Sequence, residues 1–523
     1  MNRFCLAVAF AGVTLAPSIA CVITSGDRSD GGIDGGGGAG AGADAGAGAD
    51  AGAGADAGAD ASADAGAEAD AGAEADAGAE ADAGVDGGAE DAGPVTCWTA
   101  PAFVENDNSN SAELPRIAVD GFGNAFIVWY QVPQGSSNFR AFATRYSAAD
   151  GGWSEPVALS PASSQAYTPE VAADRAGNAA VVWSQNNTIM GSRFTPAMGW
   201  SDAGIILVSD GGTTIQQLDP RVGIDDAGNA TAIWVGCNGS CTASNIYASR
   251  LVAQSETWTP PGIIHPTGGL VARNAALSVE GAGNAIAVWT QGGEKTWANR
   301  FNVATGLWGD AGVLSSSGVY FSVLPAVAIG VDGNAVAAWG QGTVDTAPNE
   351  TRIAVSRYIS ASDSWTSAVT IDPADAGKST AARVAVDGVG NAIVLWVNLG
   401  TSYYNWGYVW GSRYSAADAG WEAPTTMSVD AGYAETPRIG FDSAGNAVAL
   451  WLLGTGGPWW VWSRHYNATS ASWGPEVKVH VAKNGVGAYG AIDLAVTESG
   501  RAFATGMAYD DGGVYSAWAS TCP

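Results

Sequence analysis

The chain has 523 residues, and 51 acidic against 22 basic residues give it a net charge of −29. Only four of its residues are lysines, and no basic stripe is present, so binding to nucleic acid is not expected. Much of the negative charge is confined to one segment, because residues 30–91 contain 16 acidic residues and no basic residue.

The N-terminus is typical of an export signal. Arg3 supplies a positive charge, residues 4–15 are apolar, and small residues ending at Ala20 mark a cleavage site. Cys21 follows directly, so the segment resembles a bacterial lipoprotein signal, in which a lipid is attached to the new N-terminal cysteine. We expect residues 1–20 to be this signal and Cys21 to be lipidated. Ordinary cleavage after Ala20 is the alternative.

Residues 21–95 are expected to form a disordered tether. From about residue 26 to residue 93 the chain is almost wholly Gly, Ala, Asp and Glu, and no aromatic residue interrupts it. Such a segment buries too little apolar area to offset the entropy lost on ordering, and its glycines oppose a stable helix. Its predicted role is that of an acidic stalk that holds a domain away from a membrane.

The remaining segment, residues 96–523, repeats one phrase about every 54 residues. The first copy, residues 117–129, is an alternating stretch, a Gly-rich turn ending in Asn124, and an apolar run ending in Trp129. A worn copy near residue 494 closes a series of eight. The turn asparagine returns at Asn178, Asn229, Asn284, Asn334, Asn391 and Asn446.

Each repeat predicts four short strands and no helix. In the first repeat the strands are expected at residues 116–120, 125–131, 139–146 and 153–159, with turns between them. Eight such units predict an all-β fold, an eight-bladed β-propeller preceded by the disordered acidic linker. An open stack of hairpins is the alternative.

The two ends of the repeat region favour a closed ring. The last repeat ends without a fourth strand, while the segment that begins at Cys97 matches the fourth-strand openings at Trp153 and Trp421. The N-terminal strand therefore completes the eighth blade, which removes exposed strand edges. This places Cys97 beside Cys522 and predicts a disulfide between them; a second is predicted between Cys237 and Cys241.

The most regular residues of the repeat are expected to be structural. The turn aspartates are interpreted as acceptors for backbone N–H groups, and a lone carboxylate per turn argues against a calcium site. Tryptophans that end the second strand and open the fourth are expected to pack between sheets. The third-strand arginines are expected to bind carbonyls or turn carboxylates; they are Arg145, Arg193, Arg250, Arg300, Arg357, Arg413 and Arg464.

The Val-Asp-x-x-Gly-Asn core of the turn, as in residues 386–391, is similar to the turn of NHL-type and related bacterial propeller repeats. From roughly Cys97 to Pro523 the chain resembles uncharacterised exported repeat lipoproteins of bacteria. This resemblance implies a propeller used for binding, and it transfers no catalytic residue.

Function is expected where the blades differ, on the face formed by the second turns and the links between blades. In blades six and seven these loops are rich in aromatic residues, whose rings could stack on sugars or on a protein's apolar anchor. Internal packing of these rings is the alternative. The residues are Tyr403, Tyr404, Trp406, Tyr408, Trp459 and Trp460.

A second candidate site is the set of residues that open the first strands, nearest the channel. Five arginines and two acids would form a positive funnel that attracts an anion such as a uronate, sialate or phosphate. Salt bridges between blades are the alternative. The residues are Arg116, Glu170, Arg221, Arg273, Ala326, Arg383, Arg438 and Asp493.

The sequence contains no nucleophile elbow, phosphate loop or metal-ligand spacing. We therefore predict a protein that is not an enzyme and carries no cofactor or metal. It would be a monomer, anchored by lipid in the cell envelope at the outer membrane or cell surface, and its variable face would bind a polysaccharide or a protein. A structural or assembly component is the alternative. A propeller glycosidase or lyase using acids such as Glu294, Asp345, Glu350 and Glu435 ranks below both.

Overall fold

The computed structural model describes residues 97–107, 109–207, 216–237, 243–266, 271–292, 295–343, 351–373, 377–400, 406–454, 459–479, 491–509 and 513–523. The expected signal, Cys21 and the tether lie outside these residues, as do Cys241, Tyr403 and Tyr404. The acids Glu294, Asp345 and Glu350 also lie outside them. No helix within these ranges is long and apolar enough to cross a membrane.

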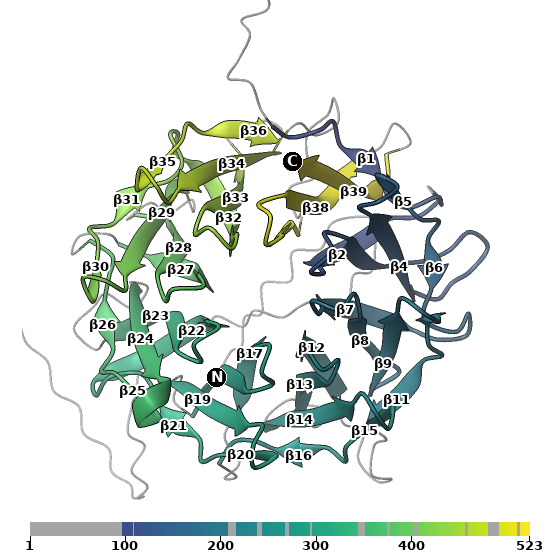
Figure 1. Ribbon diagram of the computed structural model, residues 1–523, viewed down its shortest axis with the longest axis horizontal. Coiled ribbons are helices and arrows are strands. Elements are labelled where there is room, and N and C mark those ends of the chain that lie inside the picture. The colour runs from purple at the N-terminus through teal and green to yellow at the C-terminus, as the bar shows by residue number, and fades with distance from the viewer. Residues whose placement is uncertain are drawn as a thin grey trace, which may run out of the picture. The chain divides into compact units, whose positions relative to one another are not determined.

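The described residues form a β-propeller, in which antiparallel sheets surround a central channel (Figure 1). Its first strands line the channel and carry the candidate site. They are β2 (Ala112–Val119), β7 (Ala166–Ala173), β12 (Gln216–Ile224), β17 (Ala272–Val279), β22 (Val319–Ile329), β27 (Ser379–Val386), β32 (Gly432–Phe441) and β37 (Asp493–Val496).

The second strands form the centre of each sheet and are almost wholly buried, as their apolar runs predicted. They are β3 (Ala125–Gln131), β8 (Ala179–Gln185), β13 (Ala230–Cys237), β18 (Ala285–Gln291), β23 (Ala335–Thr343), β28 (Ala392–Asn398), β33 (Ala447–Gly454) and β38 (Ala502–Tyr509). The third strands are β4 (Arg140–Ser147), β9 (Thr188–Thr195), β14 (Ser244–Val252), β19 (Lys295–Asn302), β24 (Arg352–Ile359), β29 (Trp406–Ser415), β34 (Trp459–Asn467) and β39 (Tyr515–Cys522).

The fourth strand differs from the prediction because it is broken into two short pieces that both pair with the third strand. In five of the seven blades with a broken fourth strand, a proline or glycine such as Pro156 stands between the pieces and interrupts the ladder. The pieces are β5 (Gly152–Trp153) and β6 (Val157–Ala158), β10 (Gly199–Trp200) and β11 (Gly204–Leu207), β15 (Thr257–Trp258) and β16 (Gly262–Ile263), β20 (Leu307–Trp308) and β21 (Gly312–Val313), β25 (Ser364–Trp365) and β26 (Val369–Thr370), β30 (Gly420–Trp421) and β31 (Thr425–Thr426), and β35 (Ser472–Trp473) and β36 (Val477–Val479). A short 3₁₀ helix, η1 (Ser360–Ser362), precedes β25.

The described strands form one four-stranded sheet, five five-stranded sheets and one ten-stranded sheet. The ten-stranded sheet contains two consecutive repeats, joined where β29 pairs with β32 through Trp406 and Tyr433. In chain order the strands thus fall into the eight repeats that the sequence indicates, and these are numbered below as blades one to eight.

The repeated turn is held by its own side chains, as predicted. Asp120 accepts hydrogen bonds from the backbone N–H groups of Phe122 and Asn124, both at 2.9 Å, and from the Asn124 side-chain amide at 2.7 Å. The side-chain oxygen Oδ1 of Asn124 then accepts the N–H of Ala148 in the next hairpin. Because N–H donors occupy the carboxylate, this geometry matches an Asx turn. The same set of bonds returns at Asp174, Asp387 and Asp442.

Tryptophans fill the space between sheets, which confirms their predicted structural role. Those that end the second strands have no exposed surface, and four of them donate Nε1–H to a glutamine two residues later, as Trp129 does to Gln131. Those that open the fourth strands pack against the same clusters while partly exposed. Burial of a ring this large supplies much of the apolar area of each interface.

The third-strand arginines mostly have partners that the sequence analysis missed. The guanidinium of one blade stacks on an aromatic ring of the next blade, with Arg145 5.5 Å from the Phe194 ring centroid and Arg357 4.0 Å from that of Tyr414. Arg250, Arg300 and Arg413 make the same contact. The predicted carboxylate contact occurs in Arg250, which bonds Asp225. Cation–π stacking therefore joins most neighbouring blades at their outer parts.

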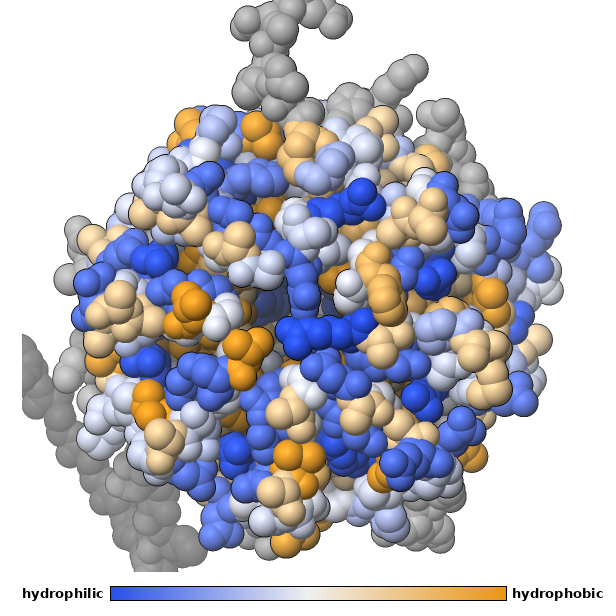
Figure 2. Space-filling view, in the orientation of Figure 1, coloured by the Kyte–Doolittle hydropathy of each residue, from blue (hydrophilic) through white to orange (hydrophobic). Residues whose placement is uncertain are grey.

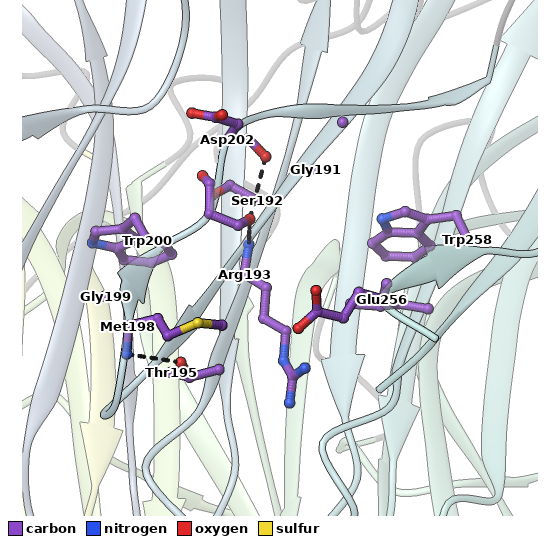
Figure 3. Close-up of a pocket in the computed structure, with 13 residues that line it drawn as sticks. Gly191, Ser192, Arg193, Thr195, Met198, Gly199, Trp200, Asp202, Glu256 and Trp258 are labelled. Atoms are coloured by element: carbon purple, nitrogen blue, oxygen red, sulfur yellow. Dashed lines mark hydrogen bonds between the residues drawn. The ribbon is translucent and has the colours of Figure 1, made fainter. Parts of the chain in front are cut away.

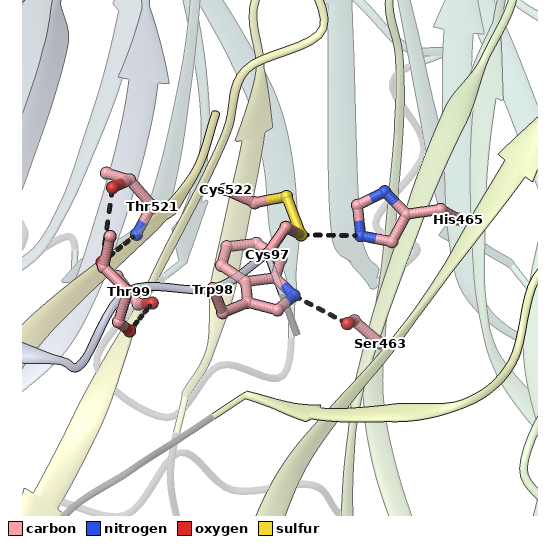
Figure 4. Close-up of a disulfide and its surroundings, with 8 residues drawn as sticks. Cys97, Trp98, Thr99, Ser463, His465, Thr521 and Cys522 are labelled. Carbon is pink, nitrogen blue, oxygen red and sulfur yellow. Dashed lines mark hydrogen bonds between the residues drawn. A yellow bond between two sulfur atoms is a disulfide. The ribbon is translucent and has the colours of Figure 1, made fainter. Parts of the chain in front are cut away.

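The two ends of the repeat region meet in one blade, as predicted. Strand β1 (Ala102–Phe103) pairs with β39, and the N–H of Thr99 donates to the Thr521 carbonyl at 2.8 Å. Cys97 and Cys522 are joined by the predicted disulfide, with their Cα atoms 4.9 Å apart (Figure 4). Cys237 is also disulfide-bonded. The ring is thus closed by hydrogen bonds and by a covalent link.

We expect the Cys97→Ser, Cys522→Ser variant to unfold more readily than the wild type. The bond closes a loop between residues 425 apart, so its loss should lower the free energy of unfolding by roughly 3–5 kcal/mol. Guanidinium unfolding followed by circular dichroism measures this difference. An unchanged midpoint would show that strand pairing alone holds the ring, and Cys5→Ser in the signal segment is the neutral control.

Candidate functional site

A backbone irregularity in each first strand shapes the wall of the channel. In seven blades the pairing with the second strand shifts register, and the residue at the shift has positive φ, as in Leu114 at 47°. A proline usually follows, such as Pro115 or Pro437. This is a β-bulge, which redirects the strand so that the next residue faces the channel. That next residue is Arg116 in blade one.

We call the residues that follow the bulges the channel ring. This ring differs from the predicted set in one member. Its residues after the bulge are Arg116, Glu170, Arg221, Ala276, Ala326, Arg383 and Arg438, with Asp493 at the start of β37. Arg273 precedes the bulge by one residue and pairs with Thr290, so it does not belong to this ring. The sequence analysis misplaced Arg273 because this blade has Asn274 and Ala275 where most other blades have a residue followed by proline.

Two acids of the ring bind arginines of neighbouring blades. Glu170 accepts from Arg116 at 3.2 Å and from Arg221 at 3.1 Å. Asp493 accepts from Arg438 at 2.9 Å, and its other oxygen accepts the N–H of Ile117 at 3.1 Å. These contacts realise the predicted alternative of salt bridges between blades, and they account for three of the four ring arginines.

Arg383 is the exception, since it makes no ion pair among the described residues and donates only to the carbonyl of Ala382, at 2.8 Å. The ring residues of the two preceding blades, four and five, are Ala276 and Ala326, which bring no charge. Burial, followed by repulsion from Arg438, Arg221 and Arg116, lowers the pKa of Arg383 to about 9. The protein thus holds a destabilised cation in the channel, a condition that a bound anion relieves.

A second group lies beside this ring at the start of β2. Tyr130 donates its hydroxyl to Glu113 Oε2 at 2.7 Å, and the two residues are register partners before the bulge. Burial raises the pKa of Glu113, while the Tyr130 hydrogen bond lowers it. Burial also raises the pKa of Tyr130, and Glu113 adds to this increase, whereas the charge of Arg116 opposes it. Glu113 is therefore a carboxylate suited to proton transfer.

Aromatic rings surround this pair. Tyr130 packs edge-on against Phe139 and Tyr167, with ring centroids 5.3 and 5.7 Å apart. Tyr130 is 7% exposed, and Tyr167 is half-buried and covers it. Together with Arg116 they form a polar and aromatic wall at the end of the channel where the second turns lie. On the face shown in Figure 2, hydrophilic side chains gather over the centre of the ring.

The four described aromatic residues of the predicted set, Trp406, Tyr408, Trp459 and Trp460, lie on strands and not in loops, because β29 begins at Trp406 and β34 at Trp459. Trp406 and Tyr408 are 38% and 37% exposed. Tyr433 lies between Trp406 and Trp459, with ring centroids 5.3 and 6.0 Å away. Trp460 is covered by the Lys478 ammonium, 3.8 Å from its ring centroid. Trp406 and Tyr408 thus offer more open surface than Trp459 and Trp460.

Sequence reasoning found the ring arginines but missed Glu113, Tyr130 and Tyr167. Glu113 precedes Leu114 and Pro115, and without the bulge the strand period alone does not place it against Tyr130. Tyr130 lies in an apolar run, so the sequence pattern predicts a core residue. One signal in the sequence marks the bulge. In five blades a residue followed by proline stands directly before the channel residue.

No protein-family model and no curated protein matches this chain. The chain is similar to a solved protein of unknown function from Dyadobacter fermentans, with 11% identity and a TM-score of 0.41 over 82% of this chain and 99% of that one. It is also similar to an ulvan lyase of polysaccharide lyase family PL25, with 11% identity and a TM-score of 0.42 over 73% and 96% of the two chains. A leech intramolecular trans-sialidase shares 9% identity, with a TM-score of 0.37 over 81% and 91%.

The prediction of a non-catalytic binding protein that uses its variable face is wrong. The two solved structures above that have a stated activity are carbohydrate-processing enzymes. The prediction that the protein is not an enzyme finds no support in these comparisons. No comparison bears on the predicted lipoprotein character or on the likeness to NHL repeats.

We expect Arg383→Met to make the protein more stable. The folded state lowers the pKa of this arginine, so below that pKa the protonated form costs stability, and a neutral side chain of similar length removes the cost. The melting temperature should rise by roughly 1–3 °C at neutral pH. Arg438→Met is the contrasting variant, because it leaves Asp493 without its arginine and should lower the melting temperature. A lower melting temperature for Arg383→Met would contradict the interpretation.

Proposed function

We propose that this protein cleaves glycosidic bonds next to carboxylated sugars of a polysaccharide, at the mouth of its central channel. The observation that carries the proposal is the unbalanced positive charge at Arg383. It faces Arg116, Arg221 and Arg438, while the acids of the ring are engaged with the latter three. An arginine fork suits a carboxylate in both charge and shape.

The wall beside the ring supplies the rest of a sugar site. Glu113 is a carboxylate next to the arginines, and the half-buried ring of Tyr167 offers a flat surface for a sugar face. Ala276 and Ala326 leave room beside Arg383 that larger residues would fill. A carboxylated sugar held by Arg383 would therefore lie within the same mouth as Glu113.

Glu113 is proposed as the general base and Tyr130 as its positioning residue. The ionised Glu113 would accept a proton from a water that attacks the anomeric carbon, which gives hydrolysis, or from the sugar carbon beside the carboxylate, which then forms a C=C bond and gives elimination. In either reaction the C–O bond to the glycosidic oxygen breaks, and the departing oxygen takes up a proton from solvent water. Arg383 would stabilise the negative charge of the sugar carboxylate in either reaction. Both reactions create a new reducing end, and only elimination creates an unsaturated sugar that absorbs ultraviolet light.

The expected consequence is that Glu113→Gln lowers kcat on a polyuronate or polysialate by about 10²–10⁴-fold. Wild-type activity should fall as pH falls through the raised pKa of Glu113, because the base must be ionised. Tyr130→Phe should retain part of kcat and move this acid limb to higher pH, since it removes the hydrogen bond that lowers the pKa. The test is to measure the reducing ends released from anionic and from neutral polysaccharides across a range of pH. Arg273→Met, outside the ring, is the matched control for Arg383→Met. Equal turnover of anionic polysaccharides by the wild type and Arg383→Met would refute the anionic site.

We also propose that the polysaccharide extends over the aromatic strands of blades six and seven. These strands begin at the same end of the blades as Glu113 and Tyr130, because both lie beside the second turns. The exposed rings of Trp406 and Tyr408 would bind sugars away from the reacting bond. The predicted signal, tether and lipid at Cys21 would place such an enzyme at the cell envelope.

Trp406→Ala should therefore raise KM for long chains about tenfold and leave kcat nearly unchanged, because the lost contact is remote from the reaction. Phe122→Ala is the matched control, since Phe122 is 65% exposed in a turn on the opposite face. Kinetics on long and short substrates measure the effect. If both variants changed KM equally, the contact would not be specific.

A further inference from the structure

A pocket of about 360 Å³ opens at the outer part of the ring, between blades two and three (Figure 3). Figure 3 shows Arg193 between Trp200 and Trp258, and Glu256 also lines the pocket. The Arg193 guanidinium donates to the carbonyl of Ala253 at 3.3 Å. Leu251 lines its wall, and Gly191 lines it where a Cβ atom would lie 3.2 Å from the Trp258 ring. We call this the rim pocket. It is formed by third- and fourth-strand residues, which are remote from the channel-lining first strands.

The rim pocket exists because blade three departs from the repeat. In blades one and three to six the third-strand arginine stacks on an aromatic ring of the next blade, and that ring also packs against the tryptophan that opens its own fourth strand. In blade three the ring position holds Leu251, the register partner of Trp258. Arg193 therefore has no aromatic ring beneath it, and within the described residues it makes no ion pair.

Blade five shows what the missing ring would contact. Tyr358 pairs with Trp365, lies 5.6 Å from the guanidinium of Arg300, and donates its hydroxyl to Asp363. Asp363 follows Tyr358 by five residues and has a φ of 48°. Glu256 follows Leu251 by five residues and has a φ of 53°. Blade three thus has leucine at the position of the tyrosine, and it has a carboxylate at the position that accepts the tyrosine hydroxyl in blade five.

We propose that the rim pocket binds a phenol. The ring would stack on Arg193, its edge would face Trp258, and its hydroxyl would donate to Glu256. This arrangement restores in blade three the contacts that Tyr358 makes in blade five. The phenol belongs to a small molecule or to a tyrosine side chain of a peptide, and the chemistry of recognition is the same for both.

The test is calorimetric titration of the full chain with p-cresol, with 4-methylcyclohexanol as the non-aromatic control of equal size. We expect saturable binding of p-cresol and none of the cyclohexanol. A blocked tyrosyl tripeptide forms the second arm, and binding at least as tight as that of p-cresol would identify a peptide source. Weaker binding of the tripeptide would identify a small molecule. Methyl glucoside is the third arm, and its binding without p-cresol binding would overturn the proposal.

Two variants locate the site. Leu251→Tyr places a tyrosine where blades five to seven already have one, so it should fold, raise the melting temperature and weaken p-cresol binding at least twentyfold. Glu256→Gln should weaken p-cresol binding about tenfold without affecting the melting temperature, since an acceptor of lower charge remains on an exposed residue. Asp363→Asn in blade five is the matched control and should change nothing in the titration. Unchanged p-cresol binding in Leu251→Tyr would place the ligand elsewhere and reject the proposal.

Discussion

The structure depends on the pairing of the two ends of the repeat region in one blade. Without β1 on the edge of β39, the eighth sheet would have one unpaired edge and the array would be open. Closure brings the eight first strands around one axis, so residues far apart in the chain become neighbours. Arg116 and Asp493, for example, lie 377 positions apart in the sequence and interact across the ring. A site built from single residues of many blades follows from this closure.

The bulge of the first strand determines which side chains meet at this axis. Its positive-φ residue is strained for a side chain such as Leu114 or Thr168, and the proline that follows fixes the next φ. The cost recurs in seven blades, so the fold tolerates it throughout. The bulge aims the next side chain at the channel, where charges of neighbouring blades meet. Glu170 and Asp493 neutralise part of this charge, and Arg383 remains without an acid.

Much of the fold was predictable because it is repeated. The Asp and Asn turns, the buried tryptophans, the closing strand and the Cys97–Cys522 disulfide follow from patterns that recur or that differ only at the ends. The broken fourth strand and the arginine–aromatic stacks were missed, because they depend on distances between blades that strand periodicity does not contain. The site was predicted in part. The arginines stand at a recurrent position, but Glu113 and Tyr130 meet only through a bulge, which shifts register by a local backbone conformation.

Repetition also makes departures from the pattern informative. A residue that every blade keeps is explained by the packing that every blade shares, whereas one that a single blade changes needs a reason of its own. Leu251 stands where other blades have an aromatic ring, so Arg193 lacks a ring to stack on. This opens a pocket beside two tryptophans. Arg383 stands after two blades that carry alanine, and its charge is opposed by its neighbours. Both departures cost the fold stabilising contacts that it obtains elsewhere from the same positions. Local rules are most often broken at functional sites, and the ligands proposed above would offset each cost by binding.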